Sequence, residues 1–445
     1  MAVIASAQCW KSCSSGDQHS IAIKTNGTLW GWGDNIRGEL GDGTYLNRKK
    51  PVQIGKDTTW AATSCGEFFT VALKSNGSIW IWGVNTYGQL GNGTSGTSSA
   101  TPTQIGTATN WKSVSAGRYH ILALKTDGTL WAWGDNGDWQ CGNGNNAGLN
   151  IPTIISSATD WQSISAGTYH STAIKTDGSL WTWGYNAYGQ LGSGITSTII
   201  VPTQMGTLKT WQCVSAGHYQ TLAIQKNGTL WAWGNNSDGE LGTGSNVNQL
   251  SPVQVGTDND WQMINGGGYF SIGLKQDGTI WAWGNNISGQ LGLGTTTTIN
   301  APTKIGTSGN WQTYDAGAAH TLAIQNDGSL WAWGYNISYE LGDGTTNNSL
   351  SPQNIPCSNA GVNNGPTENN PLISVYPNPS SEMLFIRNKS SGNIQVVNVL
   401  DISGRNLITQ IGNVRNIDIS KLQVGIYFLE ISAGAKSTYY QFQKI

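Results

Sequence analysis

Charged residues are scarce in this chain: they make up 11% of its 445 residues, and the formal net charge is −2. A typical soluble domain has roughly 25% charged residues. No cluster of Lys or Arg offers the positive field that a nucleic acid or an anionic membrane surface would need. No apolar run approaches the ~20 residues of a membrane-spanning helix. The sequence therefore predicts neither a nucleic-acid partner nor a transmembrane segment.

Helical periodicity is also missing from the first 357 residues, whereas glycine (60 residues) and tryptophan (22 residues) are abundant. Tryptophan recurs every 50 or 51 residues, in three registers that hold 21 of the 22 tryptophans. The first register contains Trp10, Trp60, Trp111, Trp161, Trp211, Trp261 and Trp311, and the other two form Trp-x-Trp pairs that start at Trp30 and end at Trp333. A fixed period of this length indicates an array of similar units, none of which can bury its apolar face alone.

One unit, residues 161–206, predicts four strands, at 161–167, 170–175, 180–184 and 202–206, the last of which is opened by a proline. The second and third strands are separated by Asp-Gly, and all seven units have Asn-Gly or Asp-Gly at this point. Such pairs favour a two-residue type I′ hairpin turn, because they tolerate positive φ. Seven such units predict an all-β fold, a seven-bladed β-propeller.

The two ends of the array suggest how the ring closes. The first unit starts at Trp10 without a preceding Pro-x-x-Ile strand, and the last unit is followed by such a strand at 352–356. If that strand completes the first blade, the ring is clasped by its two ends. Cys9 and Cys357 then fall close together in one loop, so we expect a disulfide between them; two unpaired thiols are the alternative. The other cysteines are expected to be small apolar fillers: Cys13, Cys65, Cys141 and Cys213.

The composition changes at both ends of the array. Residues 1–7 are apolar and end in Ala-Ser-Ala, which resembles a cleavage site, so we interpret them as the remnant of a signal peptide. An arbitrary N-terminus is the alternative. The propeller is expected at 8–357. Residues 358–371 are rich in Asn, Gly and Ser, which is typical of a linker, and residues 372–445 are expected to form a second domain.

Two blocks of the repeat resemble a known family. Residues 127–136, Asp-Gly-Thr-Leu-Trp-Ala-Trp-Gly-Asp-Asn, and residues 189–192, Gly-Gln-Leu-Gly, are similar to the repeat of the regulator of chromosome condensation family. The resemblance runs through all seven units. It implies a propeller, and the family includes nucleotide exchange factors, chromatin binders and secreted bacterial propellers that bind protein partners through one face. No acidic or basic loop here matches the exchange activity.

The last 70 or so residues resemble a different family, the C-terminal sorting domain of cargo for the bacterial type IX secretion system. The resemblance rests on Tyr376, Pro377, Asn378, Pro379, Gly404, Gly425 and Tyr427. It implies a small antiparallel β-sandwich, recognition by the secretion machinery, and a protein that is secreted or displayed on the outer cell surface.

Side chains that differ between the units gather in the loops after the first and third strands, which should open on the same face of the disc. The sequence predicts a partner-binding surface there, made of Arg37, Phe68, Tyr87, Arg118, Tyr119, Trp139, Tyr169, Tyr188, His218, Tyr219 and Tyr269. Tyrosines around variable polar residues are typical of protein-recognition surfaces. The alternative is that these aromatic residues pack between blades. Trp139 replaces a loop glycine and is the best single candidate for an exposed aromatic residue.

The remaining polar repeats favour structural roles. Four histidines share a register that holds Phe69, Gln220 and Phe270 in other units, which argues against metal ligands: His19, His120, His170 and His320. Glu39, Glu240 and Glu340 alternate with glutamine in their register, which indicates a hydrogen-bonding position. The recurring indoles favour packing between blades over sugar binding.

The sequence thus contains no recognisable catalytic set, metal site or cofactor motif, and the chain is not expected to be an enzyme. The leading hypothesis is a secreted or surface-displayed module that binds a protein, or less favourably a glycan, through the loop-rich face of the propeller. The alternative is an extracellular enzyme that acts on a polysaccharide or peptide at the central opening.

Overall fold

The computed structural model describes residues 9–357, 373–376, 381–388, 396–401, 405–412, 414–433 and 436–444. The chain divides into two compact units, residues 1–358 and 359–445. The described residues are strands, turns and loops, and they include no helix that could cross a membrane. Several predictions lie outside the described residues: the signal remnant at 1–7, the linker at 358–371, and the motif residues Pro377, Asn378, Pro379 and Gly404.

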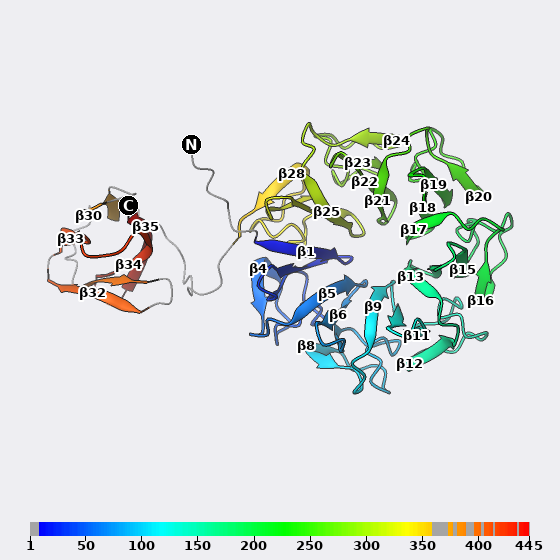
Figure 1. Ribbon diagram of the computed structural model, residues 1–445, viewed down its shortest axis with the longest axis horizontal. Helices are drawn as coiled ribbons and strands as arrows, with labels where there is room; N and C mark the ends of the chain where they lie inside the picture. The colour runs from blue at the N-terminus through cyan, green and yellow to red at the C-terminus, as the bar shows by residue number, and fades with distance from the viewer. Residues whose placement is uncertain are drawn as a thin grey trace. The chain divides into compact units, whose positions relative to one another are not determined.

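The first unit is a ring of seven four-stranded antiparallel sheets (Figure 1), which confirms the predicted propeller. Blade 1 contains β1 (Trp10–Ser15), β2 (His19–Lys24), β3 (Leu29–Gly33) and β4 (Arg48–Ile54). Blade 2 contains β5 (Trp60–Cys65), β6 (Phe69–Lys74), β7 (Ile79–Gly83) and β8 (Ser99–Gln104). Blade 3 contains β9 (Trp111–Ala116), β10 (His120–Lys125), β11 (Leu130–Gly134) and β12 (Leu149–Ser156).

The later blades repeat this order. Blade 4 contains β13 (Trp161–Ala166), β14 (His170–Lys175), β15 (Leu180–Gly184) and β16 (Ile199–Gln204). Blade 5 contains β17 (Trp211–Ala216), β18 (Gln220–Gln225), β19 (Leu230–Gly234) and β20 (Gln249–Gln254). Blade 6 contains β21 (Trp261–Gly266), β22 (Phe270–Lys275), β23 (Ile280–Gly284) and β24 (Ile299–Lys304). Blade 7 contains β25 (Trp311–Ala316), β26 (His320–Gln325), β27 (Leu330–Gly334) and β28 (Ser349–Ile355).

The first strand of each blade lies next to the central axis and the fourth lies at the rim (Figure 1). The fourth strand is longer than the sequence predicted. In blade 4 it begins at Ile199, three residues before Pro202. Because β16 is the outer edge of its sheet, the missing N–H of the proline removes no ladder hydrogen bond there.

The turn between the second and third strands differs from the predicted type I′ turn. In blade 1 the N–H of Gly27 donates to the carbonyl of Lys24, and the N–H of Lys24 donates to the carbonyl of Thr28, so the loop has three residues. Gly27 has a φ of 79°, but Asn26 is not among the residues with positive φ. Such a loop combines a type I turn with a glycine bulge. Asn26 is needed for its side chain, which accepts hydrogen bonds from the N–H and hydroxyl of Thr28.

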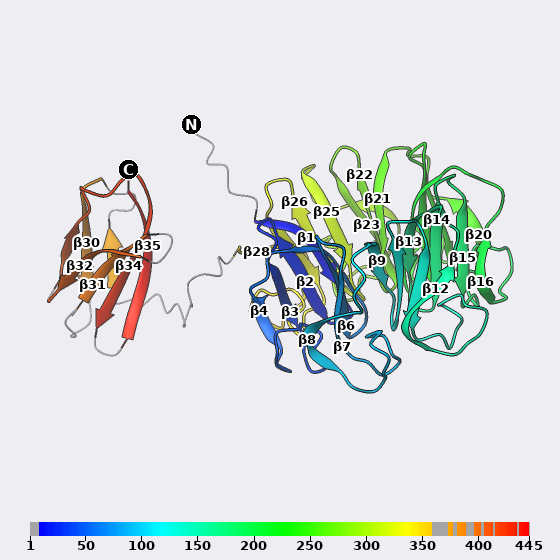
Figure 2. The ribbon, with the colours of Figure 1, turned by 60° about the horizontal axis from the view of Figure 1, so that its bottom comes forward.

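The ring does not close through a shared strand, so the predicted strand clasp is wrong. β28 pairs with β27 inside blade 7, and blade 1 is completed by its own β4. Each unit is followed by its own Pro-containing strand, so seven units supply seven such strands and none is left over. Figure 2 shows β1 beside β25 and β26, and the N–H of Trp10 donates to the carbonyl of Gly328 as that of Trp60 does to Gly27.

A disulfide between Cys9 and Cys357 spans the same junction, with the two Cα atoms 6.2 Å apart. These residues occupy the positions where a chain segment such as 307–310 joins two consecutive blades elsewhere in the ring. Cys141 is fully buried, as expected of an apolar filler, and Cys13, Cys65 and Cys213 are partly buried and unpaired.

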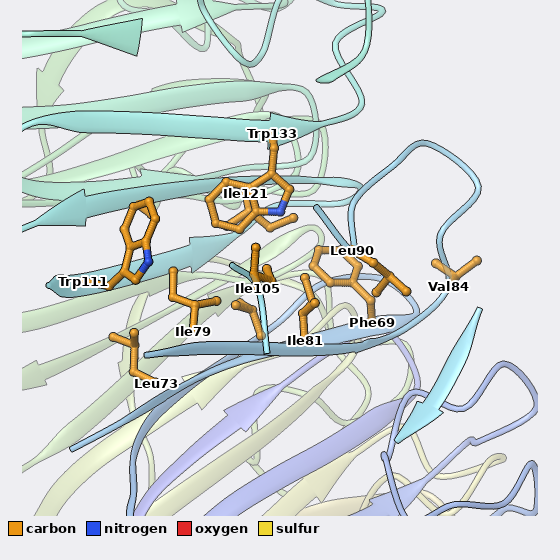
Figure 3. Close-up of a cluster of buried hydrophobic side chains, with 12 residues drawn as sticks. Phe69, Leu73, Ile79, Ile81, Val84, Leu90, Ile105, Trp111, Ile121 and Trp133 are labelled. Carbon is orange, nitrogen blue, oxygen red and sulfur yellow. The ribbon is translucent and has the colours of Figure 1, made fainter. Parts of the chain in front are cut away.

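Apolar side chains fill the spaces between neighbouring blades. Figure 3 shows Phe69, Ile79 and Ile81 of blade 2 facing Trp111, Ile121 and Trp133 of blade 3. The indole N–H of Trp133 donates to the carbonyl of Gln89 in blade 2, at 2.9 Å. The second tryptophan of every Trp-x-Trp pair is buried and makes the same bond to the preceding blade, with N–O distances of 2.8–2.9 Å. The recurring indoles therefore join the blades, as predicted.

A ring of polar side chains on the first strands also ties the blades together. The hydroxyl of Ser14 accepts a hydrogen bond from the backbone N–H of Cys65 in the next blade, at 3.0 Å. The hydroxyls of Ser64, Ser115, Ser165 and Ser215 make the same link to the following blade. Asp315 completes the circle, because its carboxylate accepts hydrogen bonds from the side-chain amide of Asn265 in blade 6 and from the N–H of Ser15 in blade 1.

The second unit contains two antiparallel sheets. One sheet contains β29 (Ile373–Tyr376), β30 (Met383–Asn388) and β33 (Asn416–Asp418), and the other contains β31 (Val396–Leu400), β32 (Asn406–Ile411), β34 (Gly425–Ala433) and β35 (Lys436–Lys444). Leu384 and Ile417 of the first sheet share one core with Val397, Leu429 and Phe442 of the second. The unit is thus a small β-sandwich.

Three residues of the sorting motif have visible places in this sandwich. Tyr376 ends β29 and Gly425 opens β34. Tyr427 is buried, its ring stacks on Phe442, and its hydroxyl donates to the carbonyl of Gln423 at 2.9 Å.

Candidate functional site

The loops that follow the first strands surround a cavity at the centre of the propeller. A glycine from each blade lines it, from Gly16 in blade 1 to Gly317 in blade 7, and its volume is about 310 Å³. A Cβ on Gly16 would lie 2.8 Å from the carbonyl of Gly66 in the next blade, so the blades approach too closely for a side chain. The residue after each glycine therefore decides the chemistry of the cavity: Asp17, Glu67, Arg118, Thr168, His218, Gly268 and Ala318.

Three charged side chains lie on one side of the cavity. Arg118 forms a two-pronged ion pair with Glu67, and its second contact, from Nη2 to Oε1, is 3.3 Å long. Its Nη1 donates to the hydroxyl of Tyr169 in blade 4. Asp17 lines the same cavity but has no hydrogen-bond or ion-pair partner among the described residues.

The surroundings shift the pKa values of two groups in this cavity. Burial, followed by the nearby Glu67 carboxylate, raises the pKa of Asp17 to about 6. Burial, followed by the positive charge of Arg118, lowers the pKa of His218 to about 4, so the imidazole is neutral at physiological pH.

Tyrosines form a continuous cluster on blades 4 to 6. Tyr219 lies 5.8 Å from Tyr169, 5.0 Å from Tyr188 and 6.3 Å from Tyr269, measured between ring centroids. Tyr185 adds a further ring, at 6.1 Å from Tyr169. His218 packs edge-on against Tyr269 at 5.5 Å. The tyrosines thus form a crescent rather than a full circle, and Tyr169 at one end of it contacts Arg118.

The third-strand loop of one blade reaches the first-strand loop of the next. Arg37 lies 3.9 Å above the ring of Phe68, and Tyr87 lies 4.9 Å from Tyr119. Tyr188 contacts Tyr219 in the same way. These contacts confirm that both loops open on one face. The aromatic residues fit both interpretations, packing between blades and exposure on a binding surface. Their rings contact the neighbouring blade, while Tyr87, Tyr188 and Tyr269 stay 45%, 38% and 39% exposed.

Trp139 is partly buried rather than fully exposed. It occupies a register that is glycine in five blades and has a φ of 59°; Tyr339 holds the same register in blade 7 with a φ of 70°. Positive φ costs a non-glycine residue of order 1 kcal/mol, and such strain is concentrated at functional sites.

The polar repeats have the structural roles that the sequence predicted. His19 is buried, and its Nε2 lies 3.0 Å from the hydroxyl of Thr70 in the next blade; His120, His170 and His320 bond across blades in the same way. The carboxylate of Glu39 accepts a hydrogen bond from the N–H of Arg37. Within the described part of the chain, no group of three His, Cys, Asp or Glu residues has the arrangement of a metal site.

The structure thus brings the other predicted site residues into contact around the cavity and its rim, and it places Trp139 in the third-strand loop of blade 3. Sequence reasoning left three residues out of the predicted site: Asp17, Glu67 and Tyr185. Tyr185 follows the Trp-x-Trp-Gly block directly, at a position held elsewhere by Asp34, Val84 or Asn235. Variation among the seven units at this position was the signal that could have identified it.

Comparisons with protein families agree with these observations. The family model of the RCC1-like domain matches residues 151–366. The model of the Regulator of chromosome condensation (RCC1) repeat matches residues 26–73, 76–124 and 127–174. A second model of the same repeat matches residues 10–39 and 60–89. Residues 374–444 match the Secretion system C-terminal sorting domain. A search of curated proteins gave no match.

Solved structures support the fold. Human WBSCR16 is 22% identical, with a TM-score of 0.66, and the match covers 74% of this chain and 94% of that chain. Yeast RCC1 (Prp20), solved bound to Kap60, is 20% identical, with a TM-score of 0.67, and the match covers 84% of this chain and 88% of that chain. At these identities the likeness establishes the architecture alone.

The repeats, the ring of seven blades and the terminal sandwich all point the same way. The chain is a seven-bladed propeller of regulator of chromosome condensation repeats with a C-terminal type IX sorting domain, and it is secreted or displayed on the outer cell surface.

Proposed function

We propose that the protein is an extracellular binding module that recognises a protein partner through the loop-rich face of the propeller. One observation carries the proposal: side chains that differ from blade to blade gather on this face, around a cavity, while the rest of each blade repeats. Partly exposed tyrosines beside an arginine are the residue types enriched where protein interfaces gain most of their energy. No catalytic role is proposed for these residues.

The cavity is small compared with the face that surrounds it. Its volume of about 310 Å³ is at the lower end for small-molecule sites, whereas the aromatic and charged residues extend outward over blades 1 to 6. A partner that covers this face would therefore bury the tyrosine crescent and insert one side chain at the centre. A glycan partner has less support, because the crescent tyrosines lie against one another and offer edges and partial faces for stacking.

The experiment is affinity capture from the native extracellular medium with the full chain as bait. A variant with Tyr87→Ala, Tyr188→Ala and Tyr269→Ala removes three exposed tyrosines of the predicted binding surface, and it should lose the captured partner while its unfolding temperature changes little. A control variant with Asp127→Asn, Asp177→Asn and Asp277→Asn alters the opposite face with residues that other blades have at the same position.

Equal capture by the tyrosine variant and the wild type would contradict the proposal. Hydrolysis of a polysaccharide or peptide that is lost in the tyrosine variant would favour the alternative hypothesis of an enzyme at the central opening.

A further inference from the structure

The cavity has an unbalanced charge. Its ionised side chains are the carboxylates of Asp17 and Glu67 and the guanidinium of Arg118. His218 also lines the cavity but is neutral. The cavity therefore has a net charge of −1, and a ligand with a single positive charge would neutralise it.

Arg118 forms its direct ion pair with Glu67 and not with Asp17, although its positive charge acts on Asp17 and tends to lower the pKa of that carboxyl. Its Nε and Nη2 hold the carboxylate of Glu67 in blade 2, and its Nη1 donates to Tyr169 in blade 4. The guanidinium is thus occupied between blades 2 and 4. Asp17 in blade 1 is left as a carboxylate without a partner among the described residues, in a place where burial makes an unpaired charge costly.

The other walls leave room for a long side chain. Blades 6 and 7 contribute Gly267, Gly268, Gly317 and Ala318, so apart from Tyr269 this side of the cavity consists of backbone and small residues. Tyr169, Tyr219 and Tyr269 also line the cavity, and tyrosine rings attract cations. A cavity of about 310 Å³ accommodates one extended side chain but not a folded loop.

We propose that this cavity receives one lysine or arginine side chain of the protein partner, with the carboxylate of Asp17 as its counter-ion. The inference rests on the proposed function, since it specifies the partner group that enters the centre of the binding face. Asp17 acts by direct contact with the cation. The tyrosines surround the aliphatic part of the same side chain.

A displayed library of random peptides provides the probe. The library is selected on the full chain, and peptides are kept if they fail to bind the Tyr87, Tyr188 and Tyr269 triple variant, because these peptides use the loop-rich face. Synthetic copies are then measured against the wild type and Asp17→Asn. Each peptide is also made with its lysine replaced by norleucine or its arginine by citrulline, which removes the charge and keeps most of the shape.

The expected result is a double-mutant cycle with strong coupling. Asp17→Asn should weaken the cationic peptide about tenfold or more, as should neutralising the peptide, while Asp17→Asn should have little effect on the neutral peptide. Asp127→Asn is the matched control: it removes one carboxylate from the opposite face, at a position where other blades have asparagine, and should leave affinity unchanged.

The two proposals fail in different ways. Peptides that need the tyrosines but bind Asp17→Asn as well as the wild type would overturn the inference about the cation and leave the binding face in place. A selection in which no peptide depends on the tyrosines would count against the proposed function itself, and the inference would fall with it.

Discussion

The two faces of the propeller share one backbone frame but differ in what their side chains do. On the face with the hairpin turns, each blade repeats one relay: the side chain of Asn26 accepts the N–H and hydroxyl of Thr28, and that hydroxyl accepts the indole N–H of Trp30. Every blade has the N–H and indole bonds of this relay. On the loop-rich face, by contrast, the residue after the first-strand glycine differs between blades: it is Asp17 in blade 1, Arg118 in blade 3 and His218 in blade 5.

The difference between the faces shows at which positions the fold restricts the choice of residue. Side chains in the turn relay use their hydrogen-bonding groups on each other, so a change at one position leaves a partner unsatisfied. Side chains around the cavity extend from glycine-bounded loops whose geometry is set by backbone bonds, such as that from the N–H of Gly16 to the carbonyl of His19. We therefore expect these side chains to tolerate substitution better than those of the turn relay.

The largest effect is expected where an indole joins two blades. Trp133→Ala removes a fully buried side chain and leaves the carbonyl of Gln89 without its donor, so it should lower the free energy of unfolding by about 3–5 kcal/mol. Denaturant unfolding measures this loss. A loss below about 1 kcal/mol would mean that the blades are held together mainly by other contacts.

A second prediction concerns the buried carboxyls in the loops. Burial raises the pKa values of Glu39, Glu240 and Glu340 to about 7, above the value in the unfolded chain. These groups therefore stabilise the fold fully below about pH 4.5, and this contribution is lost as pH rises toward 7. The Glu→Gln triple variant should be more stable than the wild type at pH 8, by about 3 kcal/mol per site, and by less than about 1 kcal/mol per site at pH 5.

The reverse change provides the control for this prediction. Gln89 occupies the same register in blade 2, with its side-chain oxygen accepting the N–H of Tyr87. Gln89→Glu should lower the unfolding temperature at pH 8 but not at pH 5. Unfolding temperatures that do not depend on pH in any of these variants would show that the carboxyls are ionised throughout without cost.

The smallest effect on stability is expected at Trp139. Trp139→Gly restores the residue found in five blades at a position of positive φ, so relief of strain offsets lost packing, and stability should change by less than about 1 kcal/mol. If Trp139 belongs to the binding face, capture of the partner should weaken nonetheless. Calorimetry and affinity capture on the same variant separate the two effects, and a large destabilisation would place Trp139 with the interblade residues.

The sequence was sufficient for the fold because its strongest signals are local and repeated seven times. Tryptophans two residues apart identify the third strand, and their period gives the number of blades. The turn type could not be read from Asn26-Gly27 alone, since Asn is favoured there for its side-chain hydrogen bonds rather than for positive φ. Closure was mispredicted because the Pro-containing strand at 352–356 was assigned to the first unit, although each unit already has one.

The site was predictable in outline and not in its pairings. Variation among units located Arg118, Tyr169 and Tyr219 on one face. Arg37 lies over Phe68 because of the way neighbouring blades are offset from each other. Glu67 is paired and Asp17 is not, because the guanidinium of Arg118 points toward Glu67. Neither the offset between blades nor the direction of a side chain can be predicted from the spacing of residues along the chain.

The bond between Cys9 and Cys357 has a mechanical consequence during export. The sorting domain is attached to the propeller through the chain that follows Cys357, so any pull exerted by the secretion machinery reaches the ring at that residue. With the cross-link formed, β28 of blade 7 and β1 of blade 1 share this tension, so β28 alone no longer carries the whole load. In a reduced ring β28 can separate from β27 by itself, whereas in an oxidised ring its separation also pulls on β1.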